Sequence, residues 1–265
     1  MTRAALALAL AAGFARPALA QSQTPPDSPE ITVRAERRRE TPGALTLPAR
    51  LAREGAGTQA DPAKAIQSLP RVGHGAASEA EPVLWGSAPG ESQTFVDGVE
   101  IPRLFHGSGV RSVVPALALS SVTSTPGAYA AEHGRALGGL VELSTRAPAL
   151  DHAHLRASVD LLDASALGAV PVPALDGAAQ LALRYGYVNR WLPSLIDPGL
   201  RGQYRIPAYG DGQAQLTQRL GAHDSLRWVA LASSDSAESA LGSADPARRR
   251  QSSQHADFWR IYTDF

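Results

Sequence analysis

The feature that most constrains the fold is an alternation of apolar and polar residues that begins beyond Pro148. In its first segment Leu155, Ala157, Val159 and Leu161 alternate with polar neighbours. The same pattern recurs over four later segments, at residues 180–187, 213–220, 226–232 and 259–265. Because successive side chains of a strand point to opposite faces, the pattern predicts strands with one apolar and one polar face.

Two fold classes share this period. Segments of about 10 residues with an apolar outer face and a polar inner face are typical of transmembrane β-strands, whereas a soluble β-sandwich buries its apolar face. The connections favour the first class, because residues 173–177 and 221–224 are short and residues 191–212 and 233–254 are long and polar, as in outer-membrane barrels. With a reversal near Asp163 and a returning strand over 167–172, the sequence predicts six strands.

The first 20 residues indicate export. A short basic start, Met1-Thr2-Arg3, precedes an apolar run over 4–12 and the small-x-small pattern Ala18-Leu19-Ala20. This order predicts a signal peptide over residues 1–20, cleaved after Ala20. A membrane anchor is the alternative, but a spanning helix needs about 20 apolar residues, and this run is interrupted at Gly13, Arg16 and Pro17.

Composition excludes several classes of function. Lys plus Arg and Asp plus Glu number 25 each, which argues against a nucleic-acid partner, since binding to phosphates needs a basic surface. Cysteine is absent, so the chain can form neither disulfides nor thiolate metal sites. A hydrophobic content of 44% is sufficient for a buried core.

Residues 21–50 are expected to form a flexible N-terminus, because 21–30 are polar and rich in proline. Within it, Glu30 precedes three β-prone residues, Ile31, Thr32 and Val33. Such a tripeptide can pair as an added strand on the sheet edge of a partner. A chance β-prone sequence, or a strand of the following domain, remains the alternative.

Residues 51–148 are predicted to form a mixed domain of helix and strand. Asp61 can cap a helix that Pro62 begins and Pro70 ends. The dipeptide Asp97-Gly98 lies between two short apolar segments, 94–96 and 99–101. This arrangement predicts a β-hairpin with a type I′ turn.

A second turn and a glycine-rich segment lead into the last strand of this domain. Pro126-Gly127 marks a turn, and glycines crowd the approach to the alternating strand 140–146, in the run Gly134, Arg135, Gly138 and Gly139. The run lacks the Lys-Ser/Thr ending and the strand-loop-helix order of a phosphate-binding loop. We therefore interpret it as structural.

No catalytic residue, metal ligand or cofactor-binding residue is predicted. His106 near Ser108 suggests a nucleophile, but no orienting acid stands at a recognisable spacing. His152 and His154 share one strand face and could bind a metal, but a third ligand is missing. We expect a polar loop at the first position and a polar rim at the second.

Taken together, these segments resemble the N-terminal part of a TonB-dependent outer-membrane receptor. The resemblance rests on Ile31-Thr32-Val33 as a TonB-box-like segment, on residues 61–72, on 95–99, and on the glycine-rich run from Pro126 to 141. It implies an α+β fold: a mixed α/β plug domain followed by the opening antiparallel strands of an incomplete transmembrane β-barrel. Its domains would be 1–20, 21–50, 51–148 and 149–265.

The resemblance also implies partners and a location. The TonB energy-transducing protein would grasp Glu30 to Val33, outer-membrane lipid would surround the strands, and a scarce small-molecule substrate of the siderophore, cofactor or saccharide class would be taken up. The sequence departs from the family at Trp85-Gly86, where an Arg-Gly pair is usual, and six strands cannot close a barrel. A truncated or fragmentary receptor is therefore expected. A secreted periplasmic binding module with a soluble β-sheet half is the alternative, and an enzyme ranks third.

Overall fold

The computed structural model describes residues 41, 43–74, 81–88, 90–106, 109–131, 133–198, 206–221, 224–241 and 250–264. The predicted signal peptide and the TonB-box-like residues Glu30, Ile31, Thr32 and Val33 lie outside these ranges, so the expectations for them stay predictions. The described residues form two larger sheets, which we call the first sheet and the second sheet, and a small hairpin.

The first sheet mixes parallel and antiparallel pairing. Its strand order is β1-β6-β7-β4-β5, and β4 pairs with β7 in parallel while the other neighbours are antiparallel. The five strands are β1 (Leu45–Pro48), β4 (Ser92–Val96), β5 (Val99–Ile101), β6 (Leu119–Thr125) and β7 (Gly139–Thr145). A β4–β7 parallel pair needs a long crossover, and the chain between them supplies β5 and β6.

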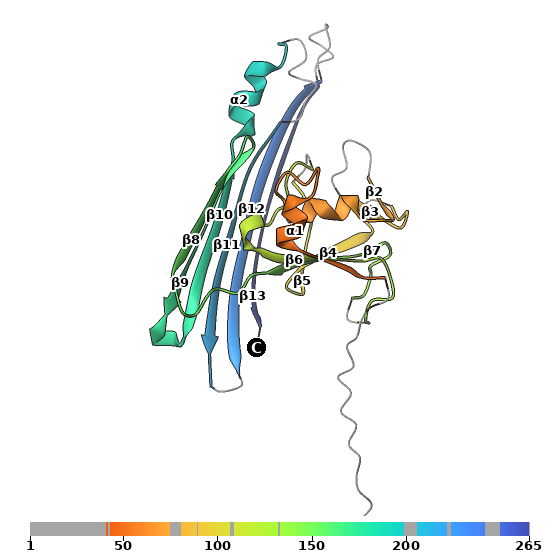
Figure 1. Cartoon of the computed structure of the whole chain (residues 1–265). Helices are drawn as coiled ribbons and strands as arrows, with labels where there is room; N and C mark the ends of the chain where they lie inside the picture. Colours follow the sequence, from red (N-terminus) through yellow and green to blue (C-terminus); the bar gives the residue numbers. More distant parts are fainter. Residues whose placement is uncertain are drawn as a thin grey trace, which may run out of the picture. The chain divides into compact units, whose positions relative to one another are not determined.

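Short helices and a hairpin accompany the first sheet (Figure 1). They are α1 (Ala49–Glu54), the 3₁₀-helices η1 (Pro62–Ser68) and η2 (Ala116–Ala118), and the antiparallel pair β2 (Val72–His74) and β3 (Pro82–Leu84). The core between them is apolar and closed: Ile66, Leu84, Val96, Leu104 and Leu143 are each 0% exposed. This burial stabilises the domain by excluding water from its apolar side chains.

The local predictions for this domain are confirmed where turn chemistry governs them. Asp97 and Gly98 have φ angles of 48° and 81°, as a type I′ turn requires, and β4 pairs with β5 across them. Asp61 caps the predicted helix by accepting a hydrogen bond from the Ala63 backbone N–H at 3.1 Å. The helix is a 3₁₀-helix, which Pro70 keeps short.

One boundary differs from the expectation. Residues 45–48, which we placed in the flexible N-terminus, form strand β1 on the edge of the first sheet, and α1 follows directly at Ala49. Four residue pairs join β1 to β6, from Leu45–Ser124 to Pro48–Ser121. The short sequence Leu45-Thr46-Leu47 alternates, but it is too short to identify a strand between Gly43 and Pro48.

The second sheet is an antiparallel meander of the predicted six strands, with the order β13-β12-β11-β10-β9-β8. Figure 1 shows them side by side. They are β8 (His154–Val159), β9 (Asp163–Val172), β10 (Gly177–Gly186), β11 (Ile206–Arg219), β12 (Ser225–Leu241) and β13 (Arg250–Asp264). The sheet is open, and β8 and β13 are its edges.

The long connections predicted over 191–212 and 233–254 are shorter than expected. The first contains α2 (Val188–Leu195), and β11 already begins at Ile206. In the second, β12 continues to Leu241 and β13 begins at Arg250. The residues that lengthen β11, β12 and β13 beyond the predicted segments pair with the neighbouring strand. Their backbone hydrogen bonds are satisfied by this pairing, so these strands continue without the apolar alternation that we used to predict them.

The faces of the second sheet have the polarity predicted from the alternation, seen most clearly on β10. Gln180 and Arg184 are buried, whereas Leu181, Leu183 and Tyr185 are about half exposed at 50%, 51% and 51%. Leu155, Val159 and Leu161 are exposed on and beside β8. The buried face of the sheet carries these polar side chains beside apolar ones such as Leu167 and Leu231, while large apolar side chains face solvent. A soluble sheet would turn those large apolar side chains inward.

Within the described ranges, no helix is both long and apolar enough to cross a membrane.

Candidate functional site

The first sheet, its short helices and the β2–β3 hairpin together form what we call the first sheet domain. A cluster of buried polar side chains joins this domain to the second sheet. We call it the interface cluster, and it consists of Asp61, His106, Arg111, Asp163, Arg184, Tyr209, Asp211 and Asp235. The first three come from the first sheet domain and the other five from β9, β10, β11 and β12. Each of these residues is less than 9% exposed, so their charges need partners inside the protein.

The centre of the cluster is an ion pair within the second sheet. Arg184 on β10 and Asp211 on β11 are direct cross-strand partners, and the Arg184 Nε and Nη2 atoms donate to Asp211 Oδ2 at 2.8 and 2.6 Å. Their side chains are 1% and 0% exposed. Removal of either partner would leave an uncompensated buried charge.

Arg184 also reaches the first sheet domain. Its Nη2 atom donates to the carbonyl oxygen of Ser112, and its Nη1 atom lies 3.9 Å from Asp61 Oδ2. Asp61 in turn accepts from the Ser112 backbone N–H at 2.6 Å and from the Ser112 hydroxyl at 2.9 Å. One guanidinium therefore connects the cap of η1 with the second sheet.

Arg111 makes the reciprocal contact from the first sheet domain. Its Nε donates to Asp163 Oδ2 at 2.6 Å, and its Nη2 donates to Asp160 in the turn before β9. The Tyr209 hydroxyl donates to the same Asp163 oxygen at 2.8 Å. Burial opposes the charge of Arg111, but the carboxylates of Asp163, Asp160 and Asp61 together outweigh it and raise the pKa of the guanidinium.

His106 is the third connection. It is 1% exposed, its Nε2 lies 3.1 Å from Asp211, and its Nδ1 lies 3.6 Å from Asp235. Its ring stacks on Tyr209 with a centroid distance of 4.7 Å. Burial disfavours the charged imidazole, but the hydrogen bond to Asp211 and the nearby Asp235 carboxylate together outweigh burial and raise the pKa of His106.

A second, smaller contact lies at the hairpin turn. Asp97 accepts from the Thr145 backbone N–H at 2.8 Å and from the Thr145 hydroxyl at 2.5 Å. Thr145 Oγ1 also accepts from Gln215 Nε2 on β11 at 3.3 Å, and Arg227 on β12 approaches Asp97 to 3.6 Å. The predicted turn residue Asp97 is thus both a turn former and a bridge to the second sheet.

The other residues of the predicted glycine-rich motif have steric roles or lie on the surface. A Cβ on Gly139 would lie 2.8 Å from Leu84 Cδ1 and 2.9 Å from the Thr125 carbonyl oxygen, and one on Gly138 would lie 2.3 Å from Ser87 Oγ. Gly98, Gly127 and Gly134 have open space around the same position. Arg135 is exposed and approaches Glu100 to 3.5 Å, and Pro126 lines a small surface pocket.

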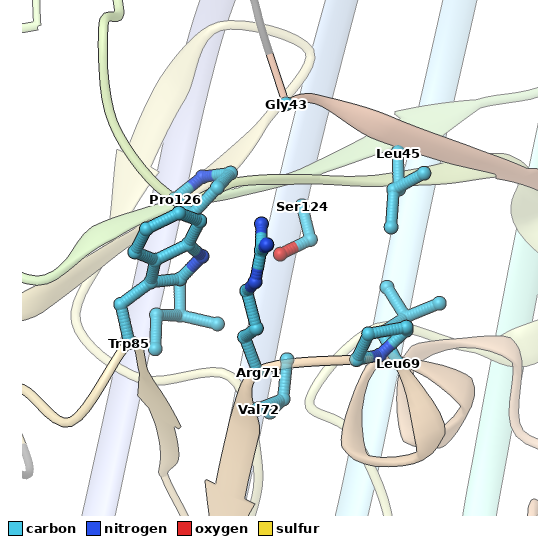
Figure 2. A pocket seen from close by; sticks show the side chains of 10 residues that line it. Gly43, Leu45, Leu69, Arg71, Val72, Trp85, Ser124 and Pro126 are labelled. Carbon is cyan, nitrogen blue, oxygen red and sulfur yellow. The ribbon is translucent and has the colours of Figure 1, made fainter.

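That pocket contains the departure from the family pattern at Trp85. Its volume is about 50 Å³, and Figure 2 shows the Arg71 side chain beside the indole of Trp85 above Val72. The guanidinium carbon lies 4.5 Å from the ring centroid, a cation–π contact. Trp85 is 57% exposed with a φ of 53°.

The histidines considered for chemistry do not form a reaction site in the part of the chain that the structure describes. The rings of His152 and His154 lie 5.6 Å apart, and His152 Nδ1 pairs with Asp151 at 2.7 Å; no group of three His, Cys, Asp or Glu residues that could hold a metal occurs in the described ranges. His106 has an acid partner that the sequence spacing did not reveal, Asp211. Its ring is sealed from solvent, however, and an acid–base catalyst must reach its substrate.

The interface cluster itself was not predicted. Arg184 was placed on the polar face of its strand, but Asp211 fell in a segment expected to be a loop, and His106 was expected in a polar loop. The available signal was the single charge of Arg184 in the middle of an alternating strand, because a charge on a buried sheet face requires a partner of opposite sign.

Of three comparisons with known proteins, the one with solved structures found similar chains. No protein-family model matches the sequence, and no curated protein matches it. Among solved structures, a mutant of the ferric enterobactin receptor PfeA from Pseudomonas aeruginosa matches at 18% identity with a TM-score of 0.49, covering 75% of this chain and 33% of the receptor.

Two further receptors give similar values. The siderophore receptor PirA from Acinetobacter baumannii matches at 16% identity with a TM-score of 0.49, covering 75% of this chain and 32% of the receptor. The ferric-catecholate import receptor Fiu from E. coli K12 matches at 11% identity with a TM-score of 0.45, covering 83% and 45%. This chain spans about a third of the length of the first two receptors.

Proposed function

We propose that this chain is the plug and the opening part of the barrel wall of a TonB-dependent outer-membrane receptor. In this proposal residues 1–20 direct export, 21–50 carry the TonB-box-like segment, 51–148 form the plug and 149–265 begin the wall. Strand β1 extends the plug to residue 45. The chain then serves energy-coupled uptake of a scarce substrate of the siderophore, cofactor or saccharide class.

The observation that carries the proposal is the inverted polarity of the second sheet. Its apolar side chains Leu181, Leu183 and Trp228 are 50%, 51% and 48% exposed, while Arg184, Asp211 and Asp235 are buried against the first sheet domain. Water would face the apolar side of such a sheet in a soluble protein, at a cost in free energy. Lipid removes that cost, and the polar side chains then line the interior, as in membrane barrels.

The same observation weighs against the alternative of a secreted module with a soluble β-sheet half. A soluble sheet would turn Leu181 and Leu183 toward a core and Arg184 toward water. The plug assignment follows from the interface cluster, because its charges from the first sheet domain satisfy the interior face of the wall. No catalytic role is included.

The test is membrane recovery after export in a Gram-negative host. The complete receptor that contains this chain is expected in the outer-membrane fraction and to require detergent for extraction, because six strands alone leave open sheet edges in lipid. Leu183→Arg places a charge in the middle of the exposed face of β10 and should cost about 2–4 kcal/mol of insertion free energy, whereas the same change near a membrane interface costs about 0–1 kcal/mol.

Leu220→Arg is the matched control, because Leu220 is 55% exposed but follows the end of β11 beside a turn. Leu183→Arg should reduce recovery in the outer membrane strongly, and Leu220→Arg should leave it close to the unmodified level. Recovery of the unmodified complete receptor in the soluble periplasm without detergent would contradict the proposal and support the secreted module.

A further inference from the structure

The charges around His106 are unbalanced in a way that its protonation corrects. Within the described ranges, four buried carboxylates of the interface cluster, Asp61, Asp163, Asp211 and Asp235, face two buried guanidiniums, Arg111 and Arg184. Arg103, Lys64 and Asp160 stand at the rim, through Arg103–Asp235 at 3.3 Å, the electrostatic interaction of Lys64 with Asp61, and the Arg111–Asp160 pair. The remaining excess is one negative charge, which a cationic His106 balances.

His106 is also placed to connect two strands of the second sheet at once. Its Nε2 faces Asp211 on β11 at 3.1 Å and its Nδ1 faces Asp235 on β12 at 3.6 Å. The neutral imidazole carries a proton on only one nitrogen, whereas the imidazolium donates from both. Only the protonated ring can therefore act as a donor toward both carboxylates.

We propose that His106 is a pH-sensitive latch, which in its protonated form holds the Arg103–His106 segment of the first sheet domain against β11 and β12 and on deprotonation loosens that contact. The latch rests on the contact between the first sheet domain and the second sheet and not on transport. The latch proposal can therefore be wrong while the proposed function is right, and the proposed function can be wrong while the latch proposal is right.

The charged groups that face His106 decide whether the contact weakens as pH rises or as pH falls. Asp211 and Asp235 favour the charged ring, while Arg184 on β10 disfavours it, and Tyr209 on β11 contributes the stacked ring. Because the pKa of His106 is raised in the docked state, the latch is at full strength below the ordinary value of about 6.5 and is lost as pH rises through the docked value. Alkaline conditions therefore loosen the contact.

A second titrating group touches the same segment and has to be separated from His106. Glu81 Oε1 accepts from the Leu104 backbone N–H at 3.0 Å, and burial raises the pKa of Glu81 from 4.5. A carboxyl group with a raised pKa also loses stabilisation as pH increases. Glu81→Gln removes this contribution and leaves the histidine in place.

The experiment is hydrogen–deuterium exchange on the full chain in detergent between pH 5.5 and 9. The reporters are the backbone N–H groups of His106, bonded to the Arg111 carbonyl at 2.9 Å, and of Val113, bonded to the Leu104 carbonyl at 2.9 Å. The Asp97 N–H, bonded to Leu143 at 2.9 Å, is the reference. Dividing the measured exchange rate of each N–H group by its intrinsic exchange rate gives the equilibrium constant for local opening at that group.

We expect protection of the two reporters to be constant up to about pH 6.5 and then to fall by up to tenfold per pH unit, since one proton is released on opening. The Asp97 reference should stay flat. In Glu81→Gln the fall above pH 6.5 should persist, and in His106→Gln it should disappear. The same pH profile with and without His106 would overturn the latch.

Asp235→Asn keeps the experiment decisive if His106→Gln does not fold. It removes one of the two carboxylates that favour the imidazolium, so the fall in protection should end at a lower pH. A purely structural role for His106 would instead lower protection equally at every pH and leave the shape of the profile unchanged, which contradicts the proposal.

Discussion

Arg184 and Asp211 lie directly opposite each other on β10 and β11 and form an ion pair of 2.6 Å that is almost completely buried. Arg184 uses the same guanidinium to donate to the Ser112 carbonyl oxygen. The pair therefore stabilises the second sheet and at the same time supplies the donor that holds the first sheet domain. A buried ion pair contributes little net stability by itself, but its loss is costly.

The first prediction concerns this pair. Asp211→Asn should destabilise the protein by about 3–5 kcal/mol, because Arg184 keeps its charge and loses the main carboxylate that compensates it. Asp176→Asn is the control, since it removes an exposed pair with Arg219 of nearly the same length, 2.7 Å. Thermal unfolding in detergent should show a large decrease in Tm for the first variant and none for the second; equal Tm values would contradict the role of burial.

The second prediction concerns Gly139, at the start of β7. Its φ is 132° and an added Cβ would meet Leu84 and the Thr125 carbonyl oxygen, so Gly139→Ala should cost about 1–3 kcal/mol. Gly127→Ala, where nothing lies within 4 Å, is the matched change. Chemical denaturation of both variants measures the difference, and a Gly139→Ala variant as stable as Gly127→Ala would refute the close packing.

The third prediction concerns Asp97, which combines a positive φ with two hydrogen bonds from Thr145. Asp97→Ala should cost about 1–3 kcal/mol, because two donors near the interface lose their acceptor. Asp97→Asn should cost less, since asparagine tolerates a positive φ and retains a carbonyl acceptor. Denaturant midpoints for the two variants give the order, and the reverse order would show that the charge toward Arg227 outweighs the turn.

The fourth prediction tests the TonB-box-like segment. Val33→Pro removes a backbone donor, so it should abolish binding of the purified periplasmic domain of a TonB protein and substrate uptake by the complete receptor, while substrate binding is unchanged. Gln23→Pro, in the proline-rich stretch before it, should leave both intact. Uptake that survives Val33→Pro would exclude this segment as the point of energy coupling.

Local chemistry made part of this fold predictable from sequence. Asp97-Gly98 dictates a hairpin, Asp61 caps η1, and the alternation beyond Pro148 predicts six strands and the faces of β10. These features depend on residues within a few positions of each other. The edge strand β1 was not predicted, because four residues carry too short a pattern.

The interface cluster depends on residues far apart in the chain and was therefore not predicted. His106 and Asp211 are separated by 105 positions, and Asp211 belongs to a strand extension whose proline and glycines, Pro207, Gly210 and Gly212, favour a loop locally. Tertiary pairing with β10 and β12 overrides that preference. A single charge on a buried strand face indicates that a residue of opposite charge lies nearby. Which residue that is depends on the register of the strands, which the sequence does not show.

The edge position of β1 has a mechanical consequence. Everything before residue 45 is attached to the first sheet through a strand that is paired on one side only, by four residue pairs with β6. Tension applied at the N-terminus therefore loads this short edge strand first. The strands β6 and β7 share longer pairing, so β1 is expected to separate from β6 before β6 separates from β7.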